Sequence, residues 1–232
     1  MVKKHIIRII AALTLISAAL PASASASSFI GFGDSNTEGL SFKSYGYDLD
    51  LRWVVRTGAI NAGISGNHTD QAIKRFNADV LSKNPDSVAI MFGINDGLLY
   101  DNGKPMVEKT KFERNLTYMV RELKSRKIKV LLMTNIPVQQ TLYYNMYPEK
   151  KHLYAEKGGI RLWMNSYNAI IRKVAKAEGV QLVDHYANAI HKAGGAQDGK
   201  LWASGLYDRS GLHWSPRGHG MIAYSINYYL AR

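Results

Sequence analysis

Short apolar runs recur along the chain, separated by longer segments in which apolar residues return with a helical period. Each run is bounded by glycine, polar or charged residues, which is typical of buried strands. The middle runs do not alternate between apolar and polar positions, as expected when helices cover both faces of a sheet. We therefore predict five strands, at residues 28–32, 59–62, 87–92, 129–133 and 180–183.

Three of the intervening segments place apolar residues on one face of a helix. The first face holds Phe112, Leu116, Met119, Val120 and Leu123. The second holds Ile160, Trp163, Met164, Tyr167, Ile170, Ile171 and Val174. The third helix is expected to start with Ser215 as N-cap and Pro216 in its first turn, and to direct toward the core Met221, Ile222, Ser225 and Tyr229. Alternating strands and helices predict a parallel sheet with right-handed crossovers, hence a three-layer α/β/α domain.

The start of the chain resembles an export signal rather than part of the fold. Three cations precede an apolar stretch from Ile9 to Leu20, which is short for a membrane span. Small residues suited to a signal peptidase follow Pro21. We expect a signal peptide over residues 1–26 and a single domain over 27–232, with an uncleaved anchor as the alternative. The processed protein is then expected outside the cytoplasm, without a stable membrane span.

Composition and charge limit the chemistry and the partners. The chain has 232 residues and no cysteine, which excludes disulfides, thiolate metal sites and a cysteine nucleophile. No spacing of histidine and acidic residues resembles a metal site, so we expect no metal and no cofactor. The net charge of +12, or +9 without the signal, favours contact with an anionic envelope polymer. We expect no nucleic-acid partner.

Polar turns containing glycine follow the first three predicted strands, at residues 33–36, 61–67 and 93–97. Each alone is compatible with an ordinary turn, because Gly, Asn, Asp and Ser all suit turns for local reasons. Ligands of an open parallel sheet bind beyond the carboxyl ends of its strands. Three such turns after consecutive strands, with His213 near the C-terminus, therefore predict one common site.

These turns carry a resemblance to a known family. The chain resembles the SGNH (GDSL) hydrolases, and especially their small secreted or periplasmic esterase and thioesterase members, in four ordered blocks from Gly33 to His213. The resemblance implies Ser35 as nucleophile, His213 as the histidine of the fourth block, and Gly66 and Asn95 as the residues of the second and third. It also implies a five-stranded sheet with flavodoxin-like strand order.

The residue types fit hydrolysis of an ester. A serine hydroxyl is a poor nucleophile until a neighbouring base removes its proton, and neutral His213 is suited to that task. Attack on an ester produces an oxyanion, which fixed hydrogen-bond donors stabilise. By resemblance, these donors are the N–H groups of Ser35 and Gly66 and the side-chain amide of Asn95. The absence of a Cβ at Gly66 allows close approach of the backbone.

The residue that orients the histidine departs from the family pattern. The family usually places an aspartate three residues before its histidine, and here that position is Ser210. Asp208, two residues further upstream, reaches the ring if the loop is bulged, and we assign it the third catalytic position. The hydroxyl of Ser210, a backbone carbonyl and Asp184 at the end of the fifth strand are the alternatives.

Other polar residues near the blocks are expected to support the structure. Asp34 and Asp96 are expected to hold their loops by accepting backbone N–H bonds. His219 lies within the last predicted helix and is expected on its surface or in its packing. His68 either lines the cleft or belongs to an ordinary loop.

The leading functional interpretation is hydrolysis of a carboxylic ester outside the cytoplasm, through an acyl-Ser35 intermediate. A short acyl group is expected because, apart from the apolar strands and helix faces of the core, no segment supplies an apolar groove. The preferred substrate is an O-acetyl group on a cell-envelope or extracellular polysaccharide. The tyrosine-rich segment 142–154 either stacks on sugar rings, with Lys150 and Lys151 attracting anions, or forms a loop that covers the core edge.

Two other functions remain open on the sequence alone. The pair His213-Trp214 resembles that of sugar O-acetyltransferases related to this fold, so a polysaccharide O-acyltransferase is the first alternative. Loss of the usual aspartate at Ser210 makes a non-catalytic binding protein the second.

Overall fold

The computed structural model describes residues 28–39 and 59–231; the expected signal peptide lies outside the described residues. A parallel five-stranded sheet in the order β2-β1-β3-β4-β5 forms the centre. Its strands lie within one residue of the predicted bounds: β1 Phe29–Gly33, β2 Ile60–Gly63, β3 Ser87–Met91, β4 Lys129–Met133 and β5 Gln181–Val183. This is the flavodoxin-like order that the family resemblance implied.

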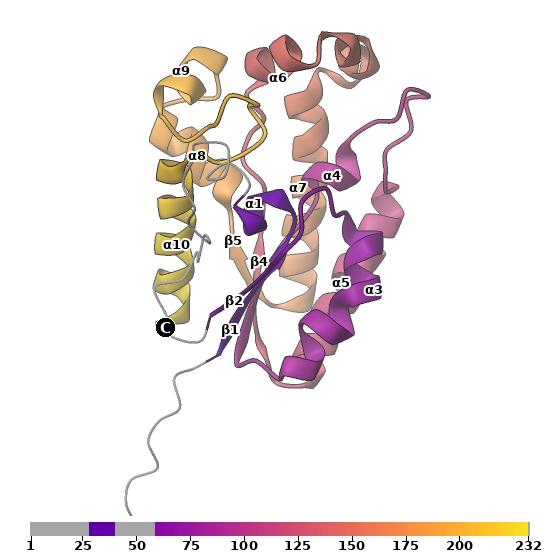
Figure 1. Ribbon diagram of the computed structural model, residues 1–232, viewed down its shortest axis with the longest axis vertical. Helices are drawn as coiled ribbons and strands as arrows, with labels where there is room; N and C mark the ends of the chain where they lie inside the picture. Colours follow the sequence, from indigo (N-terminus) through magenta and orange to yellow (C-terminus); the bar gives the residue numbers. More distant parts are fainter. Residues whose placement is uncertain (1–27, 40–58, 232) are drawn as a thin grey trace, which may run out of the picture.

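Helices cover both faces of the sheet (Figure 1). The α-helices are α1 Ser35–Glu38, α3 Thr69–Asp79, α4 Ile94–Gly97, α5 Lys109–Ser125, α6 Gln140–Met146, α7 Ile160–Glu178, α8 His185–Ala193, α9 Asp198–Ala203 and α10 Pro216–Leu230. Two 3₁₀ segments are η1 Leu81–Lys83 and η2 Pro148–Lys157. Helices α3, α5 and α7 pack on one face, and α8, α9 and α10 on the other. The three-layer α/β/α architecture is therefore confirmed.

Successive side chains of each strand enter opposite cores, as the period of a β-strand requires. In β3, Val88 and Ile90 join the core beneath α3, α5 and α7, while Ala89 and Met91 join the core beneath α8 and α10. Both sets are fully buried. This explains why the predicted strands show no alternation between apolar and polar residues.

The apolar face predicted for α5 is buried along its whole length. That of α7 is confirmed as well, with Trp163 and Ile170 only partly buried at its edge. Helix α10 starts as predicted, because the Ser215 hydroxyl accepts the N–H of Gly218 and Pro216 is the first helical residue.

The predicted core face of α10 is confirmed. Ile222 and Ser225 are buried, and Met221 and Tyr229 pack partly buried against the same core. His219 and Ile226, which the predicted face did not include, are also buried. Gly218 allows the first turn of α10 to pack closely on the preceding loop, since a Cβ there would lie 2.6 Å from a ring carbon of Trp214.

The tyrosine-rich segment is helical rather than a loop. It spans α6 and η2, and Tyr143 and Tyr154 are buried in a third apolar cluster outside the sheet. Tyr147 remains 38% exposed. Across the described part of the chain, none of the helices has the length and apolar character needed to cross a membrane.

Candidate active site

The strand-turn-helix at the end of β1 positions Ser35. The carboxylate of Asp34 caps α1 by accepting the Asn36 N–H at 2.9 Å, and Ser35 is the first helical residue. The turn needs glycine at position 33, because a Cβ there would lie 2.6 Å from the carbonyl oxygen of Met91. Strand β1 lies between β2 and β3, so Ser35 lies at the carboxyl end of the sheet, where ligands bind.

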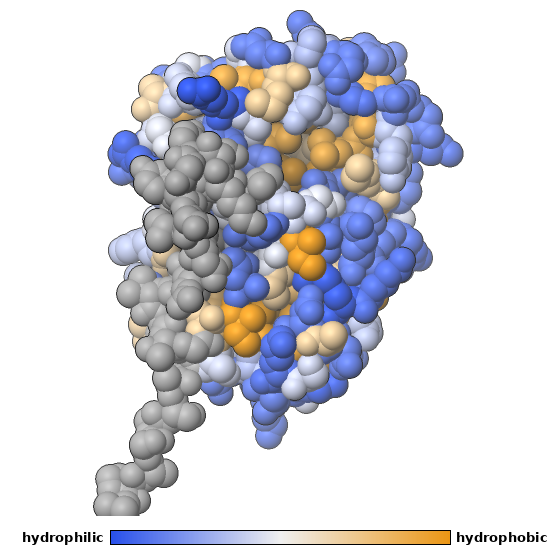
Figure 2. Space-filling view, in the orientation of Figure 1, coloured by the Kyte–Doolittle hydropathy of each residue, from blue (hydrophilic) through white to orange (hydrophobic). Residues whose placement is uncertain are grey.

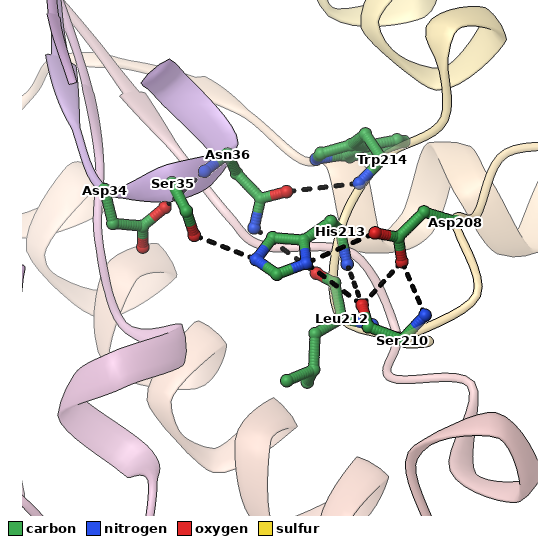
Figure 3. A network of polar contacts seen from close by, with 8 residues as sticks. All are labelled: Asp34, Ser35, Asn36, Asp208, Ser210, Leu212, His213 and Trp214. Atoms are coloured by element: carbon green, nitrogen blue, oxygen red, sulfur yellow. Dashed lines mark hydrogen bonds and ion pairs between the residues drawn. The ribbon is translucent and has the colours of Figure 1, made fainter. Parts of the chain in front are cut away.

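The hydroxyl of Ser35 and the imidazole of His213 are in contact, although 178 residues separate them in the chain. The distance from Ser35 Oγ to His213 Nε2 is 2.9 Å, within hydrogen-bond range (Figure 3). Ser35 is buried and the His213 side chain is 18% exposed. A base at this distance can take the hydroxyl proton directly.

The second ring nitrogen of His213 faces two groups, Ser210 and Asp208 (Figure 3). Ser210 Oγ lies 3.0 Å from Nδ1, and an Asp208 carboxylate oxygen lies 3.4 Å from it. The other carboxylate oxygen of Asp208 accepts the Ser210 hydroxyl at 2.5 Å and the Ser210 N–H at 2.8 Å. The Ser210 hydroxyl therefore donates to Asp208 and offers its lone pairs to the Nδ1–H.

Asp208 is ionised in this setting. Burial alone would raise its pKa, but hydrogen bonds from His213 and Ser210 outweigh burial and hold the pKa below its usual range. A negative charge therefore lies beside the imidazole even though the residue three positions upstream is a serine. Asp184, the alternative at the end of β5, lies elsewhere in the fold: it pairs with Arg172 at 2.7 Å and caps α8.

Asn36 is a residue of the site to which the sequence pattern assigned no role. Its side-chain amide donates to the carbonyl of Leu212 at 3.3 Å, and its side-chain oxygen accepts the N–H of Trp214 at 3.2 Å (Figure 3). These two residues flank His213. Asn36 thus holds the backbone of the histidine loop both before and after His213.

Asn95 of the third block is hydrogen-bonded to Asn67, the residue that follows Gly66 of the second block. The side-chain amide of Asn95, in the first turn of α4, donates to the Asn67 carbonyl at 2.9 Å. Gly66, the preceding residue, has φ +75°, which favours glycine. A Cβ at Gly66 would meet no protein atom within 4 Å, so the backbone conformation, rather than crowding by the protein, calls for glycine here.

Arg75 ties the carboxyl ends of β1 and β2 together. Its guanidinium donates to the carbonyls of Gly33 at 2.9 Å and Ala62 at 2.8 Å, and to the Asn67 side chain at 2.8 Å. Phe32 packs under it, 4.4 Å from ring centroid to guanidinium carbon. No local motif marks this arginine, because its partners lie in separate segments.

Asp34 and Asp96 hold loops, as predicted. Asp96 accepts the N–H of Thr69 at 2.9 Å and its hydroxyl at 2.5 Å, which joins α4 to α3. Burial raises the pKa of Asp34 to about 7 and that of Asp96 to about 6. Both carboxyls therefore titrate near neutral pH.

The two histidines near the blocks have structural positions. His68 is the N-cap of α3, where its N–H donates to the Gln71 side chain at 3.0 Å. His219 is buried in α10, and burial lowers its pKa to about 3, so it is a neutral packing residue. The packing alternative for His219 is therefore confirmed.

Comparisons with known proteins show which proteins the chain is similar to. The model of the GDSL-like lipase/acylhydrolase family matches residues 32–221. The uncharacterized lipoprotein YqeF of Bacillus subtilis (strain 168) is 39% identical over 208 residues, which cover 83% of this chain and 85% of that protein. An acetylxylan esterase of Geobacillus stearothermophilus is 28% identical over 171 residues, 71% of this chain and 68% of that enzyme.

The fold recurs in solved structures. A lipase/acylhydrolase from Enterococcus faecalis superposes with a TM-score of 0.62 at 21% identity, covering 88% of this chain and 95% of that one. At this identity the match supports the three-layer architecture alone.

Proposed function

The chain belongs to the GDSL-like lipase/acylhydrolase family of ester-hydrolysing enzymes, and from this premise we propose that Ser35 is its nucleophile and His213 its general base. The observation that carries the proposal is the 2.9 Å contact between Ser35 Oγ and His213 Nε2. The neutral imidazole accepts the hydroxyl proton on Nε2 as Oγ bonds to the ester carbonyl carbon. The π-electrons of the carbonyl move to its oxygen, which becomes an oxyanion.

Collapse of this intermediate breaks the bond to the alcohol oxygen, which takes the proton from Nε2 and leaves. The acyl group remains on Ser35. Water then attacks the acyl carbon, gives a proton to Nε2, and displaces Oγ, which recovers that proton. The free carboxylic acid and the resting serine result, and His213 is neutral again after each half-reaction.

Asp208 and Ser210 stabilise the imidazolium that forms in each half-reaction. The Nδ1–H of His213 lies between the Ser210 hydroxyl and a carboxylate oxygen of Asp208. Because Asp208 is ionised, its charge favours the protonated ring, and its hydrogen bonds fix Ser210 in the orientation that accepts from Nδ1.

The oxyanion is proposed to lie among three donors: the N–H groups of Ser35 and Gly66 and the side chain of Asn95. One N–H of the Asn95 amide is used by the Asn67 carbonyl, which fixes the side chain. The amide carries a second N–H for the substrate oxygen. Such preorganised donors need no rearrangement as charge develops.

For the substrate, we propose a short acyl ester, with an O-acetyl group on an extracytoplasmic polysaccharide as the main class. The relative named acetylxylan esterase supports this choice. The relative named lipoprotein, together with the export-signal pattern of residues 1–26, supports a location in the cell envelope or outside the cell, with residues 27–232 as the enzyme. Without residues 1–26 the net charge is +9, which favours an acidic polysaccharide as the substrate.

Labelling with a fluorophosphonate tests the proposal. We expect one label per chain, located by peptide mass spectrometry on Ser35, and much slower labelling of His213→Ala. The proposal fails if the label resides on another residue, or if the protein stays unlabelled while ester hydrolysis continues.

A further inference from the structure

A pocket of about 480 Å³ lies between the start of α5, the end of η2 and the first half of α7. This volume falls within the roughly 300–1,000 Å³ that small-ligand sites occupy. Its lining includes two lysines, Lys109 and Lys157, one acid, Glu156, and the indole of Trp163. The function proposed above uses none of these side chains, so the pocket is a separate feature of the surface.

Two lysine ammonium groups converge on the indole ring of Trp163. The Nζ atoms of Lys109 and Lys157 lie 4.1 and 4.8 Å from the centroid of the ring. Both lysines are half-buried, although lysine side chains are mostly exposed in folded proteins. The face of an aromatic ring attracts each cation, but it does not remove the repulsion between the two.

Neither lysine has an acidic partner among the residues that the structure describes. Glu156 also lines the pocket, but it is exposed and pairs with neither of them. By contrast, Lys150 on the same 3₁₀ segment pairs with Asp101 at 2.6 Å. Burial and the neighbouring charge of Lys157 lower the pKa of Lys109. An anion that enters the pocket would therefore relieve an unfavourable arrangement of charge.

The other side chains of the pocket suit a sugar ring. Asn165 lines the pocket, and its side-chain oxygen accepts from Arg172 at 3.2 Å, which leaves its NH₂ group without a partner in the described part of the chain. Leu162, which is 60% exposed, adds an apolar edge beside the indole. Figure 2 shows mainly hydrophilic residues over the end of the molecule where η2 lies. An aromatic ring, two cations and an amide donor fit a ring that carries hydroxyl groups and a carboxylate.

We propose that this pocket binds a uronic acid residue of an acidic polysaccharide, with the carboxylate between Lys109 and Lys157 and the sugar ring beside Trp163. The choice of a polysaccharide rests on the proposed substrate class, whereas the anion site rests on the two lysines. The pocket is also connected to α4, which carries Asn95, because the Nε1–H of Trp163 donates to the Gly97 carbonyl at 2.6 Å. A polymer held here keeps its ester groups at a high local concentration around the enzyme.

Binding of a glycan without ester groups tests the site directly. Oligogalacturonate is titrated into the full-length protein while the indole N–H signals are followed by NMR. We expect the Trp163 signal to shift and to saturate, and a neutral xylo-oligosaccharide of the same length to leave it unchanged. The proposal is wrong if oligogalacturonate leaves the Trp163 signal in place, or if the neutral oligosaccharide shifts it equally.

Inorganic phosphate distinguishes a sugar site from a site for any small anion. Phosphate carries the charge without the sugar ring, so we expect it to displace oligogalacturonate only at a large molar excess. Displacement at equal concentration would contradict a site built for a uronic acid residue.

Two charge-removing variants give the second arm. Lys109→Gln and Lys157→Gln should each raise the Kd for oligogalacturonate at least about fivefold, which corresponds to the loss of about one hydrogen bond to a charged group. Lys151→Gln is the matched control, because Lys151 is exposed on the same η2 segment and lies outside the lining. Its Kd should change less than about twofold. Equal weakening in all three variants would indicate attraction to the overall positive charge and would contradict the site.

This proposal and the proposed mechanism fail separately. Fluorophosphonate labelling of Ser35 does not depend on the pocket, and binding of oligogalacturonate does not depend on turnover. If Ser35 is labelled but oligogalacturonate does not bind, the pocket proposal alone is wrong. If oligogalacturonate binds at Trp163 but the label resides on a residue other than Ser35, the mechanism alone is wrong.

Discussion

The two halves of the proposed catalytic pair are positioned by different means. Ser35 lies at the end of a central strand, and its turn is held by a cap and by contacts within a few residues. His213 lies in a loop between α9 and α10, held by the side chains of Asp208, Ser210 and Asn36. Backbone topology fixes the serine, whereas a side-chain network fixes the histidine. Mutations around Ser35 and mutations around His213 are therefore expected to act differently.

The largest effect is expected from Ser35→Ala. The Ser35 hydroxyl contacts His213, and the turn is held by Asp34 and the backbone, so the fold should survive. Removal of the nucleophile should lower kcat on p-nitrophenyl acetate by about 10⁶-fold, by analogy with other serine hydrolases. Kinetics and thermal unfolding measure both consequences. Wild-type hydrolysis by this variant, or loss of its fold, would contradict the assignment of the serine side.

Asn95→Ala should have the next largest effect. Loss of one oxyanion donor typically lowers kcat by about 10²–10³-fold. Because Asn95 also bonds the Asn67 carbonyl, thermal unfolding is measured in parallel to separate chemistry from loop stability. A kcat within tenfold of wild type, with the fold intact, would remove Asn95 from the proposed oxyanion site.

Asn36→Ala probes the connection between the two sides. It removes the hydrogen bonds to Leu212 and Trp214 that flank His213, and we expect a drop of about tenfold in kcat with little change in KM. Asn36→Asp is the matched control, since it still accepts from the Trp214 N–H but no longer donates to Leu212. Its kcat should lie between those of the wild type and Asn36→Ala. A rise in KM by the same factor as the fall in kcat would indicate a general structural role instead.

The smallest effect concerns stability and its dependence on pH. Burial raises the pKa of Asp34 from 3.8 to about 7. Its protonated form is thus favoured in the folded state, and the associated stability is fully present below about pH 4 and lost as the pH rises through 7. Asp34→Asn cannot ionise, so its urea midpoint should fall less than that of the wild type between pH 5 and pH 8. Parallel falls would contradict the raised pKa.

The sequence allowed prediction of the parts of the site that depend on local chemistry. A buried strand followed by Gly33, Asp34 and Ser35 specifies a turn at a strand end, and the periodicity of α5 and α7 specifies their buried faces. The sheet order came from the family resemblance. These features depend on neighbouring residues or on a pattern shared by the whole family, so one sequence suffices.

The remaining parts depend on contacts between distant segments. Asn36 lies 176 residues from Leu212, and nothing near it indicates that contact. The spacing of Asp208 and Ser210 left the orienting group open, because the path of a bulged loop decides which oxygen reaches the ring.

Asp208 and Ser210 are proposed to act on His213 as one unit, and a double-mutant cycle is the sharpest test of this coupling. Asp208→Ala should lower kcat/KM by about 10³–10⁴-fold, close to the loss of a triad aspartate. Ser210→Ala should cost only about tenfold, because an Asp208 oxygen 3.4 Å from Nδ1 can still accept its proton. The double variant should be no worse than Asp208→Ala, since Ser210 is oriented through Asp208. Losses that multiply in the double variant, or an Asp208→Ala variant with kcat/KM within tenfold of wild type, would contradict the proposed coupling of Asp208 and Ser210.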